Sequence, residues 1–302
     1  MRIQNSTQME KYKLELSEEG YYTVSNPPEI AMLKEYYEKK YWQEVTGHYA
    51  ELDPVESAYI SNSVSLKGFV VSKFLNSTSK KLLDIGTGEG HTLKYFDTNG
   101  WDVLGIDFSN YGLKRHHPDM VSKLVVGDIY ESIDKLAEKK QTFSLIILDN
   151  VLEHVLSPKQ LVQKIKNILA DDKNAGILVK VPNDFSTIQS FLSDKQIIDR
   201  QYWVAPPDHL NYFNTLNIKS FFESNGFEMQ VLYADWPIEF DLLNPRTNYI
   251  NDKIAGKESH RARMMSENLI AENSMEDILN FYTAAAKVGI ERTITGLFSL
   301  NI

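Results

Sequence analysis

The chain has 302 residues, enough for one large domain or two small ones with a sizeable core. Its net charge of −9 disfavours a nucleic-acid substrate, because phosphate binding requires a basic surface. The chain contains no cysteine, which excludes disulfides, thiolate nucleophiles and cysteine-ligated zinc.

The first part of the chain predicts little regular structure before residue 29. Residues 1–30 resemble a loosely structured segment with a break at two prolines, and helices are expected over 29–44 and 54–75. The first of these helices carries a cluster of tyrosines that can cover one broad face. Packing of this face into the core is one interpretation, and a lid over a binding site is the other.

A glycine-rich turn is the most informative feature of the chain. The apolar run 81–85 predicts a buried strand that includes Asp84, and Gly86, Gly88 and Gly90 follow it before a helical pattern. Glycine allows positive φ and close approach of a ligand, and the start of a helix offers free N–H groups to an anion. The G-x-G-x-G spacing differs from the G-x-G-x-x-G of dinucleotide folds.

Three further strands are expected before residue 150. The strand 101–107 ends on Asp107, whose carboxylate can accept hydrogen bonds from both hydroxyls of a ribose. The strand 124–128 ends on Asp128, which can accept from an exocyclic adenine amine. A fourth strand over 143–149 leads into Asn150 and a Leu-Glu-His-Val segment.

The remaining pattern alternates strands and helices. Ser157 and Pro158 are typical of a helix start, and a helix is also expected over 215–225. Further strands are expected over residues 176–181, 227–234 and 292–300. This alternation predicts an α/β fold with a parallel, doubly wound sheet.

The acidic strand ends, the glycine turn and the Leu-Glu-His-Val segment together resemble the class I S-adenosylmethionine-dependent methyltransferases, over roughly 80–227. The resemblance implies S-adenosylmethionine as the cofactor. It also implies a seven-stranded Rossmann-like sheet whose seventh strand lies, antiparallel, between the fifth and the sixth. The residues it assigns to cofactor binding are Asp84, Gly86, Thr87, Gly88, Gly90, Asp107, Phe108, Asp128, Ile129, Asn150 and Tyr41.

The resemblance also divides the chain. Residues 79–235 and 290–302 are expected to form the cofactor-binding core, and residues 1–78 a helical extension whose tyrosines act as a lid. About 55 residues separate the last two strands, which is long for a hairpin connection. We expect helices over 257–273 and 275–288 and interpret 236–289 as a cap over the active site, with a dimerisation element or structural padding as the alternative.

Methyl transfer is an in-line displacement at a methyl carbon on a sulfonium, so a hydroxyl acceptor usually needs a base. His209 is the first candidate, because similar Pro-x-His segments lie near the acceptor site in the resembling subgroup, and His154 is the second. An ionised acceptor would instead need cations, which four arginines could supply: Arg200, Arg246, Arg261 and Arg263. No carboxylate–histidine set has the spacing of a metal site, so no metal is expected.

The resemblance implies a small-molecule acceptor, with an oxygen of an activated sugar or phosphate-like precursor of surface glycans as the first choice. A natural-product or quinone-type O-methyltransferase is the alternative, and an NAD-dependent oxidoreductase or a non-catalytic cofactor-binding module are rivals from other classes. The absence of an apolar signal core and of an 18-residue apolar run leads us to expect a cytoplasmic protein without a membrane span, possibly as a homodimer.

Overall fold

The computed structural model describes residues 12–29, 32–33, 52–75, 79–250 and 252–301. A seven-stranded sheet with the order β5-β4-β3-β6-β7-β10-β9 forms its centre. In chain order its strands are β3 (Lys81–Ile85), β4 (Asp102–Asp107), β5 (Leu124–Val126), β6 (Leu145–Asp149), β7 (Gly176–Pro182), β9 (Phe227–Ala234) and β10 (Thr293–Leu300). Strand β10 runs antiparallel to both β7 and β9. The predicted fold class is therefore confirmed, including the place of the last strand.

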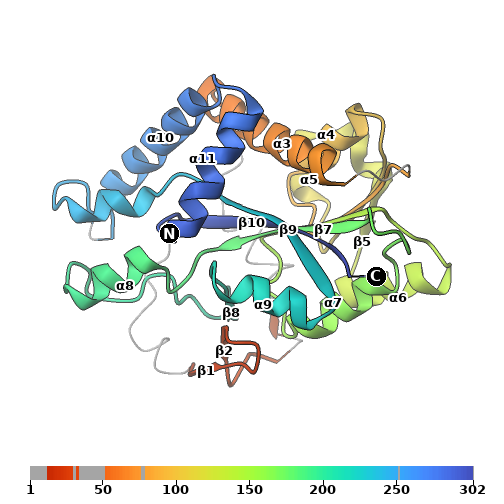
Figure 1. Cartoon of the computed structure of the whole chain (residues 1–302), viewed down its shortest axis with the longest axis horizontal. Coiled ribbons are helices and arrows are strands. Elements are labelled where there is room, and N and C mark those ends of the chain that lie inside the picture. Colours follow the sequence, from red (N-terminus) through yellow and green to blue (C-terminus); the bar gives the residue numbers. More distant parts are fainter. Residues whose placement is uncertain (1–11, 30–31, 34–51, 76–78, 251, 302) are drawn as a thin grey trace.

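Helices cover both faces of this sheet (Figure 1). One face carries α3 (Pro54–Phe74), α4 (His91–Thr98), α5 (Tyr111–His116), α10 (Lys253–Ile270) and α11 (Met275–Val288). The other face carries α6 (Ile129–Glu138), α7 (Pro158–Lys166) and α9 (Asn217–Ser224). The helix α8 (Thr187–Asp194) and the short 3-10 helices η2 (Pro118–Lys123) and η3 (Ile238–Leu243) lie in the connections.

Alternation along the strands builds a core on each side of the sheet. In β3, Leu82 packs with the helices α3 and α4, whereas Leu83 and Ile85 pack with α6 and α7. In β6, Ile147 belongs to the first core and Ile146 to the second. Because both faces are covered, the strands read as continuous apolar runs, as expected for parallel strands.

The helix boundaries follow from local capping. Ser157 accepts a hydrogen bond from the N–H of Gln160 at the start of α7, with a proline in the first turn, as predicted. Asp53 caps α3 by accepting from the N–H groups of Val55 and Glu56. Gly289 ends α11 with φ +72°, a left-handed conformation that glycine adopts without strain.

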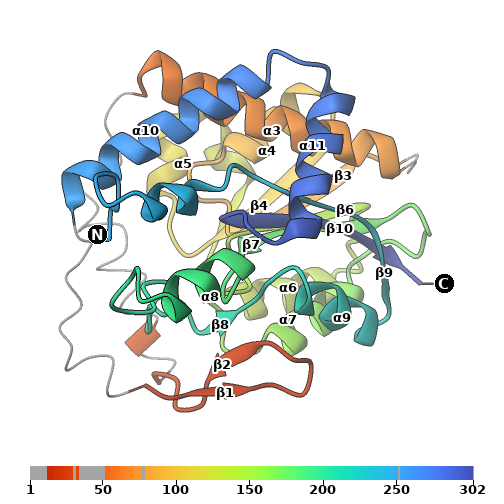
Figure 2. The same ribbon diagram turned by 60° about the vertical axis from the view of Figure 1, so that its left-hand side comes forward.

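The expectation of a loosely structured N-terminal segment is wrong for residues 14–24. The strands β1 (Leu14–Leu16) and β2 (Tyr22–Val24) form a hairpin that pairs with β8 (Asn211–Tyr212), and this small sheet lies beside α8 (Figure 2). The buried Tyr21 ring packs on Phe213 at a centroid distance of 4.5 Å. Tertiary packing thus orders a segment whose short strands carry no periodic signal.

The insert before the last strand contains the two expected helices, α10 and α11. Helix α11 contributes the buried side chains of Ile278, Leu279 and Tyr282 to the core on its side of the sheet. Helix α10 packs along α3. In the part of the chain that the structure describes, no helix has both the length and the apolar character to cross a membrane.

Candidate active site

The glycine-rich turn leaves β3 at its carboxyl end. Gly86, Gly88 and Gly90 all have φ in the left-handed region, at +74°, +57° and +81°. A Cβ at Gly86 would lie 2.6 Å from a methyl group of Val151, so only glycine fits there. A Cβ at Gly88 would meet nothing closer than the Gly86 carbonyl oxygen at 3.9 Å. The turn is therefore packed on one side and leaves room for a ligand at Gly88.

Asp107 ties this turn to the end of β4. Its Oδ2 accepts a hydrogen bond from the Gly88 N–H at 2.8 Å, and its Oδ1 accepts from the Ser109 N–H at 2.9 Å. Burial raises the pKa of the Asp107 carboxyl, and these backbone donors oppose the shift. The Thr87 hydroxyl donates to the Asp84 carbonyl at 3.0 Å and fixes the other side of the turn. The next residue, Phe108, is half-buried.

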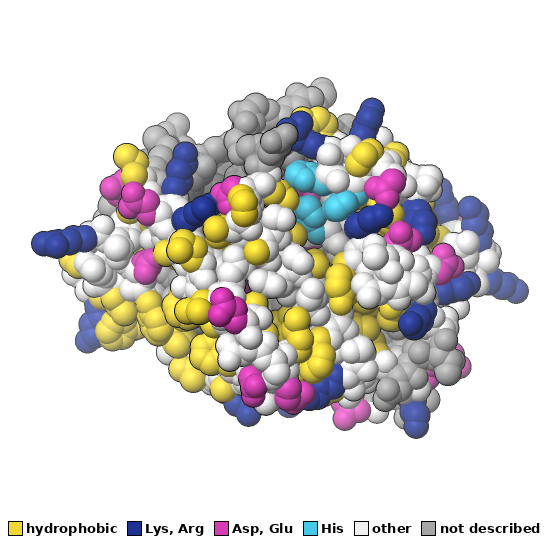
Figure 3. Space-filling model, turned by 90° about the horizontal axis from the view of Figure 1, so that it is seen from above, with side chains coloured by type: hydrophobic (Ala, Val, Ile, Leu, Met, Phe, Trp, Pro, Cys, Tyr) yellow, Lys and Arg dark blue, Asp and Glu magenta, His cyan; other side chains and the backbone are white. Residues whose placement is uncertain are grey.

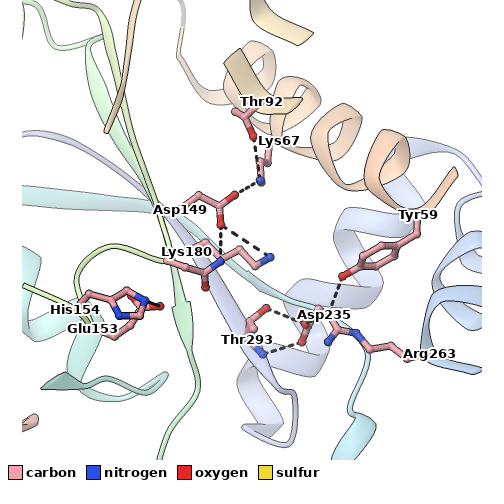
Figure 4. Close-up of polar contacts among 11 residues, drawn as sticks. Tyr59, Lys67, Thr92, Asp149, Glu153, His154, Lys180, Asp235, Arg263 and Thr293 are labelled. Atoms are coloured by element: carbon pink, nitrogen blue, oxygen red, sulfur yellow. Dashed lines mark hydrogen bonds and ion pairs between the residues drawn. The ribbon is translucent and has the colours of Figure 1, made fainter. Parts of the chain in front are cut away.

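A group of buried charges lies around Asp149 (Figure 4). Lys67 of α3 forms a close ion pair with Asp149 at the end of β6, and Lys180 of β7 lies 4.0 Å from the same carboxylate. Burial alone would raise the pKa of Asp149, but the two lysines outweigh it and hold that pKa below its usual value. Burial and then the charge of Asp149 raise the pKa of Asp84 to about 8. Sequence reasoning missed both lysines, although a lysine within the apolar strand 176–181 was a signal.

The other predicted cofactor residues lie at carboxyl ends of neighbouring strands. Asp128 follows β5 and caps α6 by accepting from the Glu131 N–H at 3.0 Å. Ile129, the next residue in the chain, is buried. Asn150 follows β6, is exposed and has a φ of +55°. Tyr41 lies outside the described residues.

The two histidines predicted to act on the acceptor come together. The rings of His154 and His209 lie 5.0 Å apart between centroids, in an edge-to-face arrangement. The Glu153 carbonyl accepts hydrogen bonds from the N–H groups of Leu210 and Asn211 at 2.7 and 3.1 Å, which joins the two segments. His154 Nδ1 donates to the Asp208 carbonyl at 2.7 Å, since a carbonyl oxygen can only accept.

Burial shifts the pKa values of Glu153 and His209. It raises the pKa of the fully buried Glu153 carboxyl to about 7. It also holds the pKa of His209 well below its usual value, and the charge of His154 adds to that shift. His209 is therefore a neutral imidazole at pH 7, able to accept a proton or bind an electrophile.

A second group of buried carboxylates lies around Arg292 at the start of β10. The Arg292 guanidinium is 3.4 Å from Glu239 and 4.0 Å from Asp184, and both carboxylates are fully buried. The Tyr202 hydroxyl donates to Glu239 at 3.3 Å. Burial raises the pKa of Asp184 to about 8. Sequence reasoning missed this group because its members come from separate connections.

Three of the four arginines considered for an anionic acceptor, Arg200, Arg261 and Arg263, have side-chain partners within the protein. Arg263 contacts Asp235, Glu267 and the Tyr59 hydroxyl, each at 2.8–2.9 Å, and lines a small cavity that also includes Lys180. Arg261 forms an ion pair with Asp53, and Arg200 with Asp199. These pairings leave them poorly suited to hold a phosphate group.

A second group of histidines, formed by His91, His116 and His117, lies at the start of α4. His117 Nε2 lies 2.9 Å from His91 Nδ1, and the rings of His91 and His116 are 5.3 Å apart. Figure 3 shows histidine side chains gathered on the face that carries α4 and α5. Burial lowers the pKa of His117 to about 4, so it is neutral at pH 7. The contact arises because α5 packs against the start of α4. The sequence alone does not show that these two helices meet.

Comparison with known proteins identifies the family. The profile of the methyltransferase domain family matches residues 67–232, more than half of the chain, so the chain belongs to this family. No curated protein matches the sequence. Family membership and fold together confirm a class I S-adenosylmethionine-dependent methyltransferase, with S-adenosylmethionine as its cofactor.

Solved structures share this fold. A SAM-dependent methyltransferase from Archaeoglobus fulgidus is 15% identical, with a TM-score of 0.50, over 80% of this chain and 94% of that one. The plantazolicin methyltransferase BamL, in complex with a triazolic desmethylPZN analog and SAH, is 12% identical with a TM-score of 0.51, over 90% of this chain and 95% of that one. At these identities the likeness shows the fold.

Proposed function

We propose that the protein transfers the methyl group of S-adenosylmethionine to a hydroxyl oxygen of a small acceptor, and that the acceptor is an activated sugar of the kind used in surface-glycan biosynthesis. The observation that carries this proposal is the pairing of His154 with His209 beside buried carboxylates, next to the cofactor strands. A neutral imidazole suits a hydroxyl acceptor, because that acceptor must lose a proton.

The residues at the glycine-rich turn fit the cofactor. Asp107 lies at the end of β4, where its carboxylate can accept from ribose hydroxyls, and the open side of Gly88 allows close approach. The cofactor carries a sulfonium and an ammonium. Burial and then the nearby carboxylates of Asp149 and Asp107 raise the pKa of Asp84, and a bound cation would offset the repulsion between these carboxylates. We assign Thr87, Phe108, Asp128, Ile129 and Asn150 to the same cofactor site.

The surroundings of the histidine pair favour a polyhydroxylated acceptor over a phosphate-like one. Asp184 and Glu239 are buried carboxyl groups in this region, and carboxyl groups suit the hydroxyls of a sugar. The half-buried Tyr202 ring belongs to the same connection and can contact the apolar face of a sugar ring. The nearby arginines are already paired within the protein.

In this reaction the acceptor oxygen attacks the methyl carbon, the carbon–sulfur bond breaks, and its electron pair remains on sulfur. We propose that His209 takes the hydroxyl proton or holds the oxygen in line. The helical insert 236–289 and the extension 1–78 are proposed to close the site and exclude water.

Methyl transfer from labelled S-adenosylmethionine to a panel of nucleotide sugars, phosphorylated precursors, quinols and phenolic natural products tests the proposal. With the acceptor that this panel identifies, we expect His209→Ala to lower kcat by about 10²–10⁴-fold, the usual contribution of general acid–base catalysis. Cofactor affinity, measured by calorimetry, should not change. The matched control is His260→Ala, at an exposed position of α10. Labelling of quinols alone would overturn the sugar assignment, and full activity of His209→Ala would exclude that residue.

A further inference from the structure

The geometry points to a divalent transition-metal site formed by Glu153, His154 and His209. Binding of the ion does not depend on the reaction. The role that we give it, activation of the acceptor hydroxyl, rests on the proposed function above.

The three side chains can reach one ion. Each offers one ligand atom, and these atoms all lie within 4.8 Å of one another. Metal–ligand distances of about 2.0–2.2 Å place the ligand atoms of a tetrahedral zinc site roughly 3.5 Å apart. Glu153 Oε1 and His154 Nε2 are already separated by only 3.7 Å. A movement of about 1 Å by His209 would close the remaining gap.

Two of the ligand side chains each have a buried polar atom that lacks a hydrogen-bond partner within the described residues. Glu153 is 1% exposed, and within the described residues neither its Oε2 nor the Nδ1 of His209 forms a hydrogen bond. Leaving such atoms unsatisfied costs free energy, so buried polar groups nearly always have partners. A single cation between the side chains would satisfy both atoms.

The supporting contacts hold the ligands in place. The hydrogen bond from His154 Nδ1 to the Asp208 carbonyl puts the proton on that nitrogen and leaves Nε2 as the ligand. The side-chain amide of Asn211 donates to the Leu152 and Val155 carbonyls at 3.0 and 2.6 Å, on both sides of the ligand pair. These contacts fix His154 and the backbone on both sides of Glu153 before any ion binds, and His209 is the ligand that moves.

Two imidazoles and one carboxylate define the metal and its chemistry. This ligand set is typical of zinc and of non-haem iron(II), and three protein ligands leave a coordination position open. The acceptor hydroxyl can occupy this position, where the cation lowers its pKa and its proton passes to water. With an ion bound, His209 acts as a ligand instead of taking that proton. The oxygen then forms the bond to the methyl carbon as the carbon–sulfur bond breaks, with the electron pair left on sulfur.

The test is calorimetric titration of untagged, chelator-treated protein with Zn²⁺, and with Co²⁺ whose visible absorption reports the ligands. We expect one ion per chain. Glu153→Gln and His209→Ala should each weaken binding by at least ~100-fold, because loss of a ligand should cost no less than loss of an outer-shell partner. His260→Ala is the matched control and should bind as the unchanged protein does.

Unchanged cofactor affinity and circular dichroism will show that each variant is folded. Equal metal affinity in the unchanged protein and in both ligand variants, or no binding at all, would overturn the site. Methyl transfer that is insensitive to chelation would overturn the role of the ion and leave the proposed function standing. Metal binding without methyl transfer to any acceptor would support the site and count against the proposed function.

Discussion

Asp107→Ala is expected to weaken S-adenosylmethionine binding by about 100-fold or more. Hydrogen bonds to a charged group contribute about 1.5–3 kcal/mol each, and two ribose hydroxyls would lose theirs. In the unchanged protein the Gly88 N–H donates a hydrogen bond to Asp107 Oδ2 at 2.8 Å. The substitution removes this bond, so the turn would lose its link to β4.

Calorimetric titration with S-adenosylmethionine and with its demethylated product measures this effect. The matched control is Asp102→Ala, because Asp102 lies at the opposite end of the same strand and is exposed. Affinity should be unchanged in that control. Equal affinity in Asp107→Ala and the unchanged protein would exclude Asp107 from the ribose site.

Lys67→Met is expected to have the largest effect on stability. The Lys67 side chain is 6% exposed, forms an ion pair with Asp149 and lies 3.4 Å from the Thr92 hydroxyl. Removal of one partner of a buried ion pair typically costs about 3–5 kcal/mol, and here it leaves Asp149 with only Lys180, at 4.0 Å, to balance its charge. We expect a decrease of that size in the free energy of unfolding, measured by denaturant titration.

Helix α3 offers a matched control on the same side of the molecule. Lys73 pairs with Glu276 of α11, but their side chains are 34% and 51% exposed. An exposed pair contributes about 1 kcal/mol or less, so Lys73→Met should have a small effect. Equal destabilisation by the two substitutions would contradict the proposal that burial strengthens the contribution of the Lys67–Asp149 pair.

The cofactor side could be predicted because its signals are local. The apolar run 81–85, the glycines after it and Asp107 lie within one stretch of about 30 residues, the size of a βαβ unit. The strand over 227–234 was predicted with its observed bounds for the same reason, since an apolar run follows a helix-ending glycine.

The acceptor side could be predicted only in part, because distant segments assemble it. His154 and His209 were each proposed from their own segments. Their meeting depends on the hydrogen bonds that the Glu153 carbonyl accepts, which spacing in sequence does not encode. Lys67 lies in a helix whose polar residues look solvated, and only the packing of α3 on the sheet shows that it is buried.

The measurement that tests the central claim most directly is calorimetric titration of the protein with S-adenosylmethionine, its demethylated product and, as a control, a nicotinamide dinucleotide. We predict saturable binding of the two sulfur compounds at one site per chain and no binding of the dinucleotide. Binding of the dinucleotide without either sulfur compound would contradict the assignment of the glycine-rich turn and Asp107 to S-adenosylmethionine.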